Sequence, residues 1–406
     1  MASSSVRRVA YHKAKVTEGL GTDNVTAYRF DHVLIKAYRK GMDLVVVEAD
    51  EAVDVNVRCR TLQVTDNEED NNNTQLFRAA KQGREDLVRK LLQEGVRPDG
   101  GHYEKRGHTA LTIACDEDHE GIVLLLLEHG ADVDAKNQEN ARTPLFWAAG
   151  AGNANVVKLL LEAGADPNGA EDNGRLTPLA VAAVRGHEDA VWALLEKGYD
   201  IDVDRKGTLD GRTVLSHSAE DGQWLIVTGL MDRGADPDSR DRNGRTPLSW
   251  AAETGRAMIV EILLTRGADP NSMDEKHCIF VGSPGGRTPL FYAADKGHED
   301  VVGLLLQKGA NANHCDQDKW SALGRAVVRG HVNVVKVLLE HGGADPEIGQ
   351  IFGDSLLEYA ERQLGAGGEH HRPSYVNINQ LLQKWSKKGE RPQASGFLEQ
   401  FYAMWR

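Results

Sequence analysis

The chain lacks the features that mark disulfide-linked and membrane-spanning proteins. Its 406 residues include only four cysteines, too few for a disulfide framework in a chain of this length. Its longest strongly apolar run, Ile122 to Leu127, is far shorter than the ~20 residues that cross a bilayer. We therefore expect no membrane segment and a reducing compartment, either the cytosol or the nucleus.

Sequence motifs for catalysis and metal binding are also missing. There is no Gly-x-x-x-x-Gly-Lys-Ser/Thr phosphate loop, no His-Glu-x-x-His zinc motif and no Gly-x-Ser-x-Gly nucleophile motif. Two His-Cys pairs, at His277-Cys278 and His314-Cys315, match no compact zinc spacing and occupy different positions in their units. We expect no enzymatic activity, no cofactor and no bound metal ion.

Basic side chains are in deficit. Lysine and arginine number 48 against 61 acidic residues, which leaves a net charge of −13. The excess acid is concentrated in residues 74–359. Because an acidic surface repels phosphate groups, we expect no direct binding of nucleic acid by this part of the chain.

The most informative feature that is present is the tripeptide Thr-Pro-Leu, which recurs at a nearly fixed interval. Its intact and degenerate copies begin at Thr74, Thr109, Thr143, Thr177, Thr213, Thr246, Thr288 and Ser321. Successive starts are 33 to 36 residues apart, except for the 42 residues from Thr246 to Thr288. A period near 33 residues is typical of a stacked helical repeat, which has no single central core and usually binds through an extended surface.

Residues 143–176 show how one unit is expected to fold. Pro144 sets φ for a first helical turn and lacks only an N–H that would be unpaired there. Gly152 and Gly164 predict the ends of two short helices, since glycine accepts the left-handed conformation of a helix exit. Turn-forming residues then predict an extended, hairpin-like loop before the next unit.

This pattern resembles the ankyrin repeat family, whose units open on T-P-L-H-x-A and contain a β-turn with two helices. Five units also end their second helix on Gly-Ala followed by an acid or amide, at Gly130, Gly164, Gly234, Gly267 and Gly309. The resemblance implies an all-α solenoid of eight repeats over residues 74–354. A degenerate ninth unit at 355–386, with a helix from Val376 to Trp385, is expected to cap the stack.

The flanking segments do not follow this period. Residues 1–65 carry no family pattern in their residues. They could form a small α/β cap on the first repeat, with an amphipathic helix from Tyr28 to Arg39 and a strand from Leu44 to Glu48. They could instead be part of a larger domain, or an arm that becomes ordered only with a partner. Residues 66–73 are expected to be a polar linker. In the tail at 387–406, aromatic side chains at helical spacing predict a short helix that either docks on the last repeat or binds a partner.

The resemblance implies a partner-binding groove lined by the first helices and the loops. In the central repeats, the groove position reads His217, Trp250 and Tyr292, and three residues later come Glu220, Glu253 and Asp295. Rings flanked by carboxylates favour a cationic guest. The predicted binding residues, with one further anchor on each side, are Trp147, His217, Glu220, Trp250, Glu253, Tyr292, Asp295 and Arg325.

The sequence thus favours a non-catalytic, monomeric scaffold that captures a basic or amphipathic segment of a protein partner. Two alternatives concern the same residues. The rings could pack against the next loop and stay covered, or the groove and residues 1–65 could enclose a small-molecule pocket whose carboxylates stabilise a cationic intermediate. A third alternative assigns binding to the N-terminal segment or the aromatic tail.

Overall fold

The computed structural model describes the backbone at residues 25–30, 33–40 and 43–49, and from 68 to 386 except for 101–106, 170, 172–175, 197, 208–209, 276–284, 349–353 and 367–371. Side chains are described from residue 72 onward, apart from those gaps and residues 365, 366 and 372. The chain divides into two compact units, Met1–Asn71 and Asn72–Arg406.

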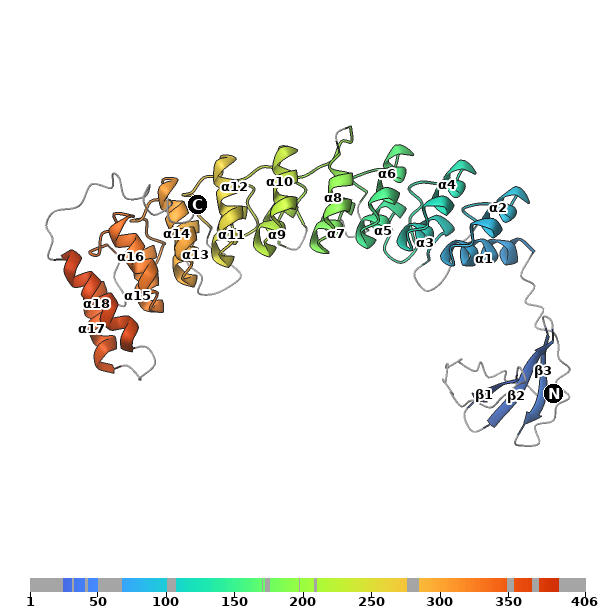
Figure 1. The fold of residues 1–406 in the computed structure, drawn as a ribbon, viewed down its shortest axis with the longest axis horizontal. Helices are drawn as coiled ribbons and strands as arrows, with labels where there is room; N and C mark the ends of the chain where they lie inside the picture. The colour runs from blue at the N-terminus through green and yellow to red at the C-terminus, as the bar shows by residue number, and fades with distance from the viewer. Residues whose placement is uncertain are drawn as a thin grey trace, which may run out of the picture. The chain divides into compact units, whose positions relative to one another are not determined.

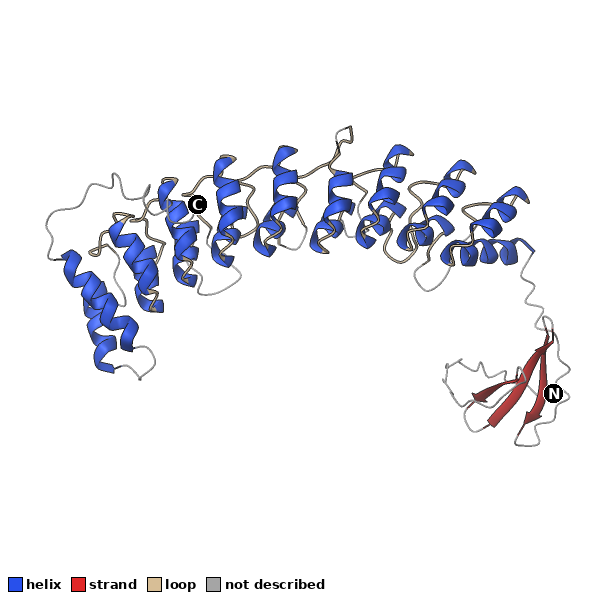
Figure 2. Ribbon diagram, viewed as in Figure 1, coloured by secondary structure: helices blue, strands red, loops and turns tan. Residues whose placement is uncertain are grey.

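The first unit contains an antiparallel sheet in the order β1 (Val25–Phe30), β2 (Val33–Lys40) and β3 (Asp43–Ala49), coloured red in Figure 2. The expected helix from Tyr28 to Arg39 is wrong, because these residues lie in β1 and β2. Val33 and Ile35 on β2 are β-branched, and such residues favour strands over helices. The expected strand from Leu44 to Glu48 lies within β3.

The second unit is a stack of helix pairs, eighteen helices in the described part of the chain (Figure 1). The first helices are α1 (Glu68–Lys81), α3 (Ala110–Asp116), α5 (Pro144–Ala151), α7 (Pro178–Val184), α9 (Val214–Asp221), α11 (Pro247–Thr254), α13 (Pro289–Lys296), α15 (Ala322–Arg329) and α17 (Leu356–Ala366). The second helices are α2 (Glu85–Gln93), α4 (Glu120–Glu128), α6 (Ala154–Glu162), α8 (Glu188–Leu194), α10 (Trp224–Asp232), α12 (Ala257–Thr265), α14 (Glu299–Gln307), α16 (Val332–Glu340) and α18 (Arg372–Ser386).

The pairs form two layers. From α3 to α17 each first helix packs on the next first helix, and from α2 to α18 each second helix packs on the next second helix. One continuous apolar cluster, which includes Leu145, Leu179, Leu248 and Leu382, runs between the layers. None of the described helices has the length and apolar character needed to cross a membrane.

In the second to the eighth unit, the opening threonine or serine is the N-cap of the first helix, whereas Thr74 of the first unit lies inside α1. Its side-chain oxygen accepts a hydrogen bond from the backbone N–H three residues later, which satisfies a donor that the helix leaves unpaired. The residues with this role are Thr109, Thr143, Thr177, Thr213, Thr246, Thr288 and Ser321.

The stack begins earlier than the sequence suggested. Helix α1 starts at Glu68, so six of the eight residues expected as a polar linker at 66–73 are helical. Acidic residues at 68–70 suit a helix N-terminus. The buried Asn73 donates from Nδ2 to the carbonyl of Gly100 at 2.7 Å and ties α1 to the loop after α2.

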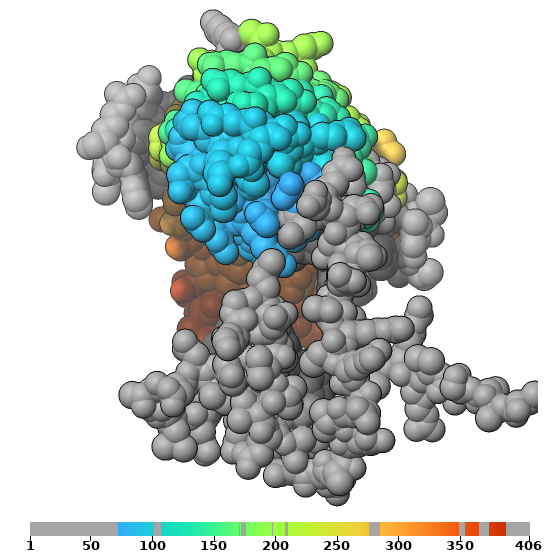
Figure 3. Space-filling view, turned by 90° about the vertical axis from the view of Figure 1, so that its right-hand side faces the viewer, coloured from blue at the N-terminus to red at the C-terminus, as the bar shows by residue number. Residues whose placement is uncertain are grey.

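Both ends of the stack are covered by helix pairs. The end-on view shows the α1–α2 pair in front of the later repeats (Figure 3), and its exposed residues include Arg78, Lys81 and Arg89. At the other end the expected helix from Val376 to Trp385 lies within α18. The predicted aromatic helix of the tail lies outside the described residues.

A histidine that follows glycine holds each of several repeats to the one before it. His298 Nε2 donates to the Glu253 carbonyl at 3.0 Å, and His331 Nε2 donates to the Asp295 carbonyl at 3.1 Å. The His298 ring lies so close to Gly255 that a Cβ there would be 2.6 Å from Nδ1. Gly255 also has φ of +75°, so glycine is required both by the backbone and by the imidazole.

A second set of hydrogen bonds between repeats runs along the loops that follow the second helices; we call each of these links a rung. In some rungs an aspartate accepts the backbone N–H one repeat on, as Asp134 does from Asp166 at 3.1 Å. In others an asparagine accepts, as Asn271 does from Asn311 at 2.7 Å, and its Nδ2 also donates to the Gly309 carbonyl at 3.1 Å. The asparagine rungs therefore make one hydrogen bond more and carry no charge.

We expect Gly255→Ala to lower the free energy of unfolding by about 1–3 kcal/mol more than Gly267→Ala, because the added methyl group meets His298. Gly267 is the matched control: its φ is +96°, and a Cβ there would have nothing within 4 Å. Denaturant unfolding of both variants measures the difference. His298→Ala in the Gly255→Ala background should remove most of it, and equal unfolding midpoints for the two alanine variants would contradict the contact.

Burial raises the pKa of Asp134, Asp204 and Asp238, and carboxylates nearby add to this against the backbone hydrogen bond. When the pKa of a carboxyl is higher in the folded state than in the unfolded state, the folded protein loses stability as pH rises from the unfolded-state pKa through the folded-state pKa. At pH 7 this loss of stability is complete. We expect Asp→Asn at these rungs to stabilise the array at pH 7, by about 0.5 kcal/mol each.

The gain should shrink as pH falls to the ordinary aspartate value, where the carboxyl is protonated in both states. Thermal melts at several pH values test this. Asn271→Asp is the reciprocal control and should destabilise; a gain from Asp→Asn that does not change with pH would rule out the charge as its cause.

Candidate partner-binding site

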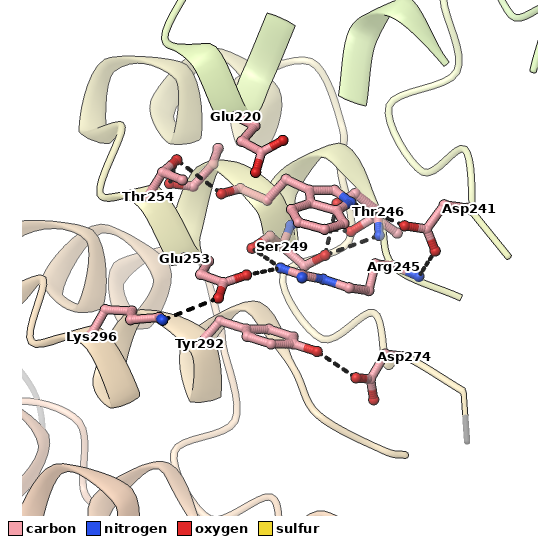
Figure 4. A network of polar contacts seen from close by, with 12 residues as sticks. Glu220, Asp241, Arg245, Thr246, Ser249, Glu253, Thr254, Asp274, Tyr292 and Lys296 are labelled. Atoms are coloured by element: carbon pink, nitrogen blue, oxygen red, sulfur yellow. Dashed lines mark hydrogen bonds and ion pairs between the residues drawn. The ribbon is translucent and has the colours of Figure 1, made fainter. Parts of the chain in front are cut away.

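The predicted groove residues come from the central first helices. Trp250 lies on α11 and Tyr292 on α13, each four residues after the opening threonine of its unit. An arginine precedes the opening threonine of the Trp250 unit, at Arg245, and of the unit before it, at Arg212. Figure 4 shows the Arg245 side chain extended alongside the Tyr292 ring.

Arginines and aromatic rings alternate in a stack. The Cζ atom of Arg212 lies 3.9 Å from the centroid of the Trp250 ring, and that of Arg245 lies 3.5 Å from the same centroid. Two guanidinium groups this close to one centroid cannot share a face, so the indole lies between them. Arg245 in turn lies 4.1 Å from the centroid of Tyr292. Stacking of this kind is strongest where, as here, the cation has lost much of its water.

The predicted carboxylates neutralise the same arginines. Glu220 pairs with Arg212 at 2.7 Å, and Glu253 pairs with Arg245 at 2.5 Å. Glu253 also contacts Lys296, at 3.4 Å. The aromatic and acidic groups are therefore arranged to hold a cation, as predicted, but the cations in place are the protein's own.

The polar edges of both rings are also engaged. Trp250 Nε1 donates to Asp241 at 3.2 Å, and the Tyr292 hydroxyl donates to Asp274 at 2.5 Å. Burial raises the pKa of Tyr292 and that of Asp274, so the phenol keeps its proton at neutral pH. Trp250 thus has a guanidinium on each face, Tyr292 has one over its ring, and a carboxylate holds the edge of each ring.

Asp295 and Arg325 continue the pattern one repeat later. Asp295 accepts from Arg325 Nε at 2.7 Å and from Arg329 Nε at 3.0 Å. Burial works to raise the pKa of Asp295, but the two arginines prevail and hold it below its usual range. Arg325 also lies 5.3 Å from the ring of Trp320.

His217 occupies the groove position before Trp250. It is half-buried, and its Nε2 lies 3.5 Å from an Asp210 carboxylate oxygen. Burial lowers its pKa, and the charge of Arg212 lowers it further. The imidazole is therefore mainly neutral at pH 7 and contributes no positive charge to the stack.

Trp147 does not join this stack. It lies on α5, only 6% exposed, with its ring centroid 4.6 Å from that of His108 and 6.3 Å from that of Phe146. Helix α7, which carries the buried Val181 at the same position, lies between α5 and α9. Of the predicted residues, the structure brings Glu220, Trp250, Glu253 and Tyr292 together, sets His217, Asp295 and Arg325 beside them on neighbouring repeats, and leaves Trp147 in a separate cluster.

The described residues offer no group of three metal-ligating side chains, and His277 and Cys278 lie outside them. The three carboxylates proposed to stabilise a cationic intermediate are each paired with arginine. The arrangement therefore supports structure and recognition, and it leaves no unpaired carboxylate in this row for acid–base chemistry.

Sequence reasoning missed the arginines. Arginine precedes the opening threonine in four units, at Arg142, Arg212, Arg245 and Arg287. This recurrence was a visible signal, since a residue just before a helix N-cap at a constant register reaches the same neighbour in each repeat. The recurrence did not show that the side chains of Arg212 and Arg245 are long enough to contact the aromatic ring of the next unit.

The stacked helix pairs define a helical-repeat protein, whose function lies on an extended surface. A family model described as ankyrin repeats (3 copies) matches residues 43–137, 131–206, 201–274 and 276–350. The chain belongs to the ankyrin repeat family.

Two curated relatives match a short part of the chain. BCL-6 corepressor-like protein 1 of Homo sapiens is 41% identical over 69 residues, and its Mus musculus counterpart is 39% identical over 69 residues. In both cases the match covers 17% of this chain and 4% of the relative. The similarity is thus confined to a small part of those proteins.

We expect Arg245→Ala to lower the free energy of unfolding by about 3 kcal/mol. The substitution removes the guanidinium that stacks on both Trp250 and Tyr292, and it leaves Lys296 as the cation paired with Glu253. The control is Arg266→Ala, which removes a 2.8 Å ion pair with Asp232 whose side chains are 38% and 53% exposed. Such a pair contributes at most about 1 kcal/mol. Denaturant unfolding compares the two, and equal losses would show that the stack adds nothing to stability.

Proposed function

We propose that this protein is a non-catalytic scaffold that binds a protein partner on the surface of its first helices. Ankyrin repeats are generally protein-interaction modules, and that class is the coarse part of the proposal. The finer part is the location: the row formed by the residue seven positions after each opening threonine. In neighbouring repeats this row reads Val184, Glu220, Glu253 and Asp295.

The observation that carries the location is the exposure along that row. Val184 is 56% exposed, whereas the side chains of Glu220, Glu253 and Asp295 are 34%, 24% and 12% exposed. The row is therefore open at α7 and α9 and closed at α11 and α13, where the internal arginines fill it. A large aliphatic side chain held in water by a rigid helix is a candidate contact for a partner.

The chemistry of the open end favours an amphipathic segment over a purely basic one. An apolar side chain of the partner would cover Val184, which follows Gly150 in the same row. A basic side chain would approach the exposed Asp221, which stands next to Glu220, whose charge Arg212 already balances. Trp250 and Tyr292 would support this surface from within rather than contact the partner with their faces, because Trp250 has a guanidinium on each face and Tyr292 is buried.

We also propose an intracellular location, in the cytosol or nucleus. Cys115 is buried as a free thiol and Cys315 is a second free thiol, which suits a reducing compartment. The name of the matched relatives, corepressor-like, agrees with the nuclear alternative.

We expect Val184→Glu to abolish partner capture without loss of helical content, because the side chain is mostly in water. Trp250→Ala is unsuitable, since it would break the stack. Affinity capture from the native cell with wild type, Val184→Glu and the control Val376→Glu (41% exposed on α18) tests the location. Proteins retained by wild type and control but lost by Val184→Glu support it; identical captured sets would refute it.

A further inference from the structure

A groove of about 830 Å³ lies on the opposite layer of the array, across the second helices α6, α8 and α10. Its lining includes Lys158 from α6, Asp189 and Trp192 from α8, and Gly229 from α10. This surface is separate from the row of first-helix residues described above. It shares no residue with the arginine–aromatic stack.

Trp192 is the apolar centre of this groove, and it is 41% exposed. Its edge lies against α10, where a Cβ at Gly229 would be 3.2 Å from Cη2 and 3.3 Å from Cζ3. Because Gly229 has no side chain, the edge of the indole packs against α10, and the remainder of the ring is exposed to solvent. At the same position of the neighbouring units stand Lys158 and Thr228, so the ring is peculiar to this part of the stack.

The charges around Trp192 are mainly negative, and the basic groups among them are already engaged. Lys158 pairs with Glu196 at 3.5 Å. Arg233 donates to the carbonyls of Leu195 and Tyr199 at 3.1 and 2.8 Å, where it closes the end of α8. Throughout the described residues, no arginine or lysine lies over the Trp192 ring.

Two carboxylates of the lining are unpaired. Asp118 and Asp189 are exposed, and neither side chain has a hydrogen bond or ion pair within the described part of the chain. Asp189 lies three residues before Trp192 on α8, so both project from the same face of that helix. The groove thus has an exposed ring with unpaired carboxylates at its rim, the same chemistry that Arg245 satisfies on the other layer.

We propose that this groove is a second docking surface, which takes a basic peptide segment of another protein with an arginine or lysine on the Trp192 ring. The same side chain would pair with Asp189. The ring and the carboxylate act together, because a cation held over an aromatic face loses water and strengthens its ion pair. The charge of −13 would also attract a basic partner from a distance.

The basic residues directly after α18 do not reach this groove in the same molecule. Lys387, Lys388 and Arg391 follow α18 within five residues, a reach of at most ~18 Å. Five helix-to-helix steps separate α18 from α8, each about 8–10 Å. Those three side chains could therefore meet the groove only in a separate molecule.

Fluorescence anisotropy with the full chain tests the proposal, using a labelled peptide of arginine and leucine and a matched peptide of glutamate and leucine. We expect only the arginine peptide to bind, and Trp192→Ala and Asp189→Lys each to weaken it about tenfold. Trp224→Ala is the matched control: Trp224 is 46% exposed on α10 but does not line the groove, and its loss should leave the affinity unchanged.

Asp189→Lys guards against loss of folding, because this side chain is exposed and makes no hydrogen bond or ion pair with the residues that the structure describes. Equal affinity in wild type, Trp192→Ala and Asp189→Lys would overturn the proposal, as would equal binding of the glutamate peptide. Sedimentation that shows a dimer disrupted by Trp192→Ala would assign the groove to a second copy of this chain instead. Val184→Glu should not affect the peptide, which separates this result from the test of the first-helix surface.

Discussion

The structure depends on one constraint: a pair of helices with seven to nine residues each cannot bury its apolar face without a neighbouring pair. Each unit must therefore present the same face at the same height as the unit before it. The threonine caps, the glycine exits and the histidines that reach back to the preceding carbonyl all serve this alignment. Because every internal pair is enclosed on both sides, small misfits such as a methyl group at Gly255 affect two repeats at once.

That alignment also explains the arginine–aromatic stack. A residue just before one helix lies beside a ring on the next, so Arg212, Trp250, Arg245 and Tyr292 meet in order although up to 80 residues separate them. Their charges are neutralised by Glu220 and Glu253. The result joins three repeats, keeps the first-helix surface rigid, and removes from that surface the cation-binding capacity that its residue types suggest.

The two layers of the array thus use one chemistry in two ways. Around Trp250 the cation is internal, while around Trp192 the ring and Asp189 face water without one. The exposed Val184 and Trp192 belong to the same unit, on its first and second helix. The fourth and fifth units therefore concentrate the features that a partner could contact, on both layers, and the units on either side supply the rigid frame.

The sequence by itself determined the repeat, the helix boundaries set by threonine and glycine, and the matching positions of Trp250 and Tyr292 on successive first helices, because these follow from local rules repeated at a constant period. It misjudged residues 28–39, where short-range periodicity could not separate a helix from two strands, and the linker at 66–73, whose last six residues are helical. Only the tertiary structure decided which rings are free. That depends on how far Arg212 and Arg245 reach across a repeat boundary and on the missing side chain at Gly229, and both are properties of packing between units rather than of any one unit.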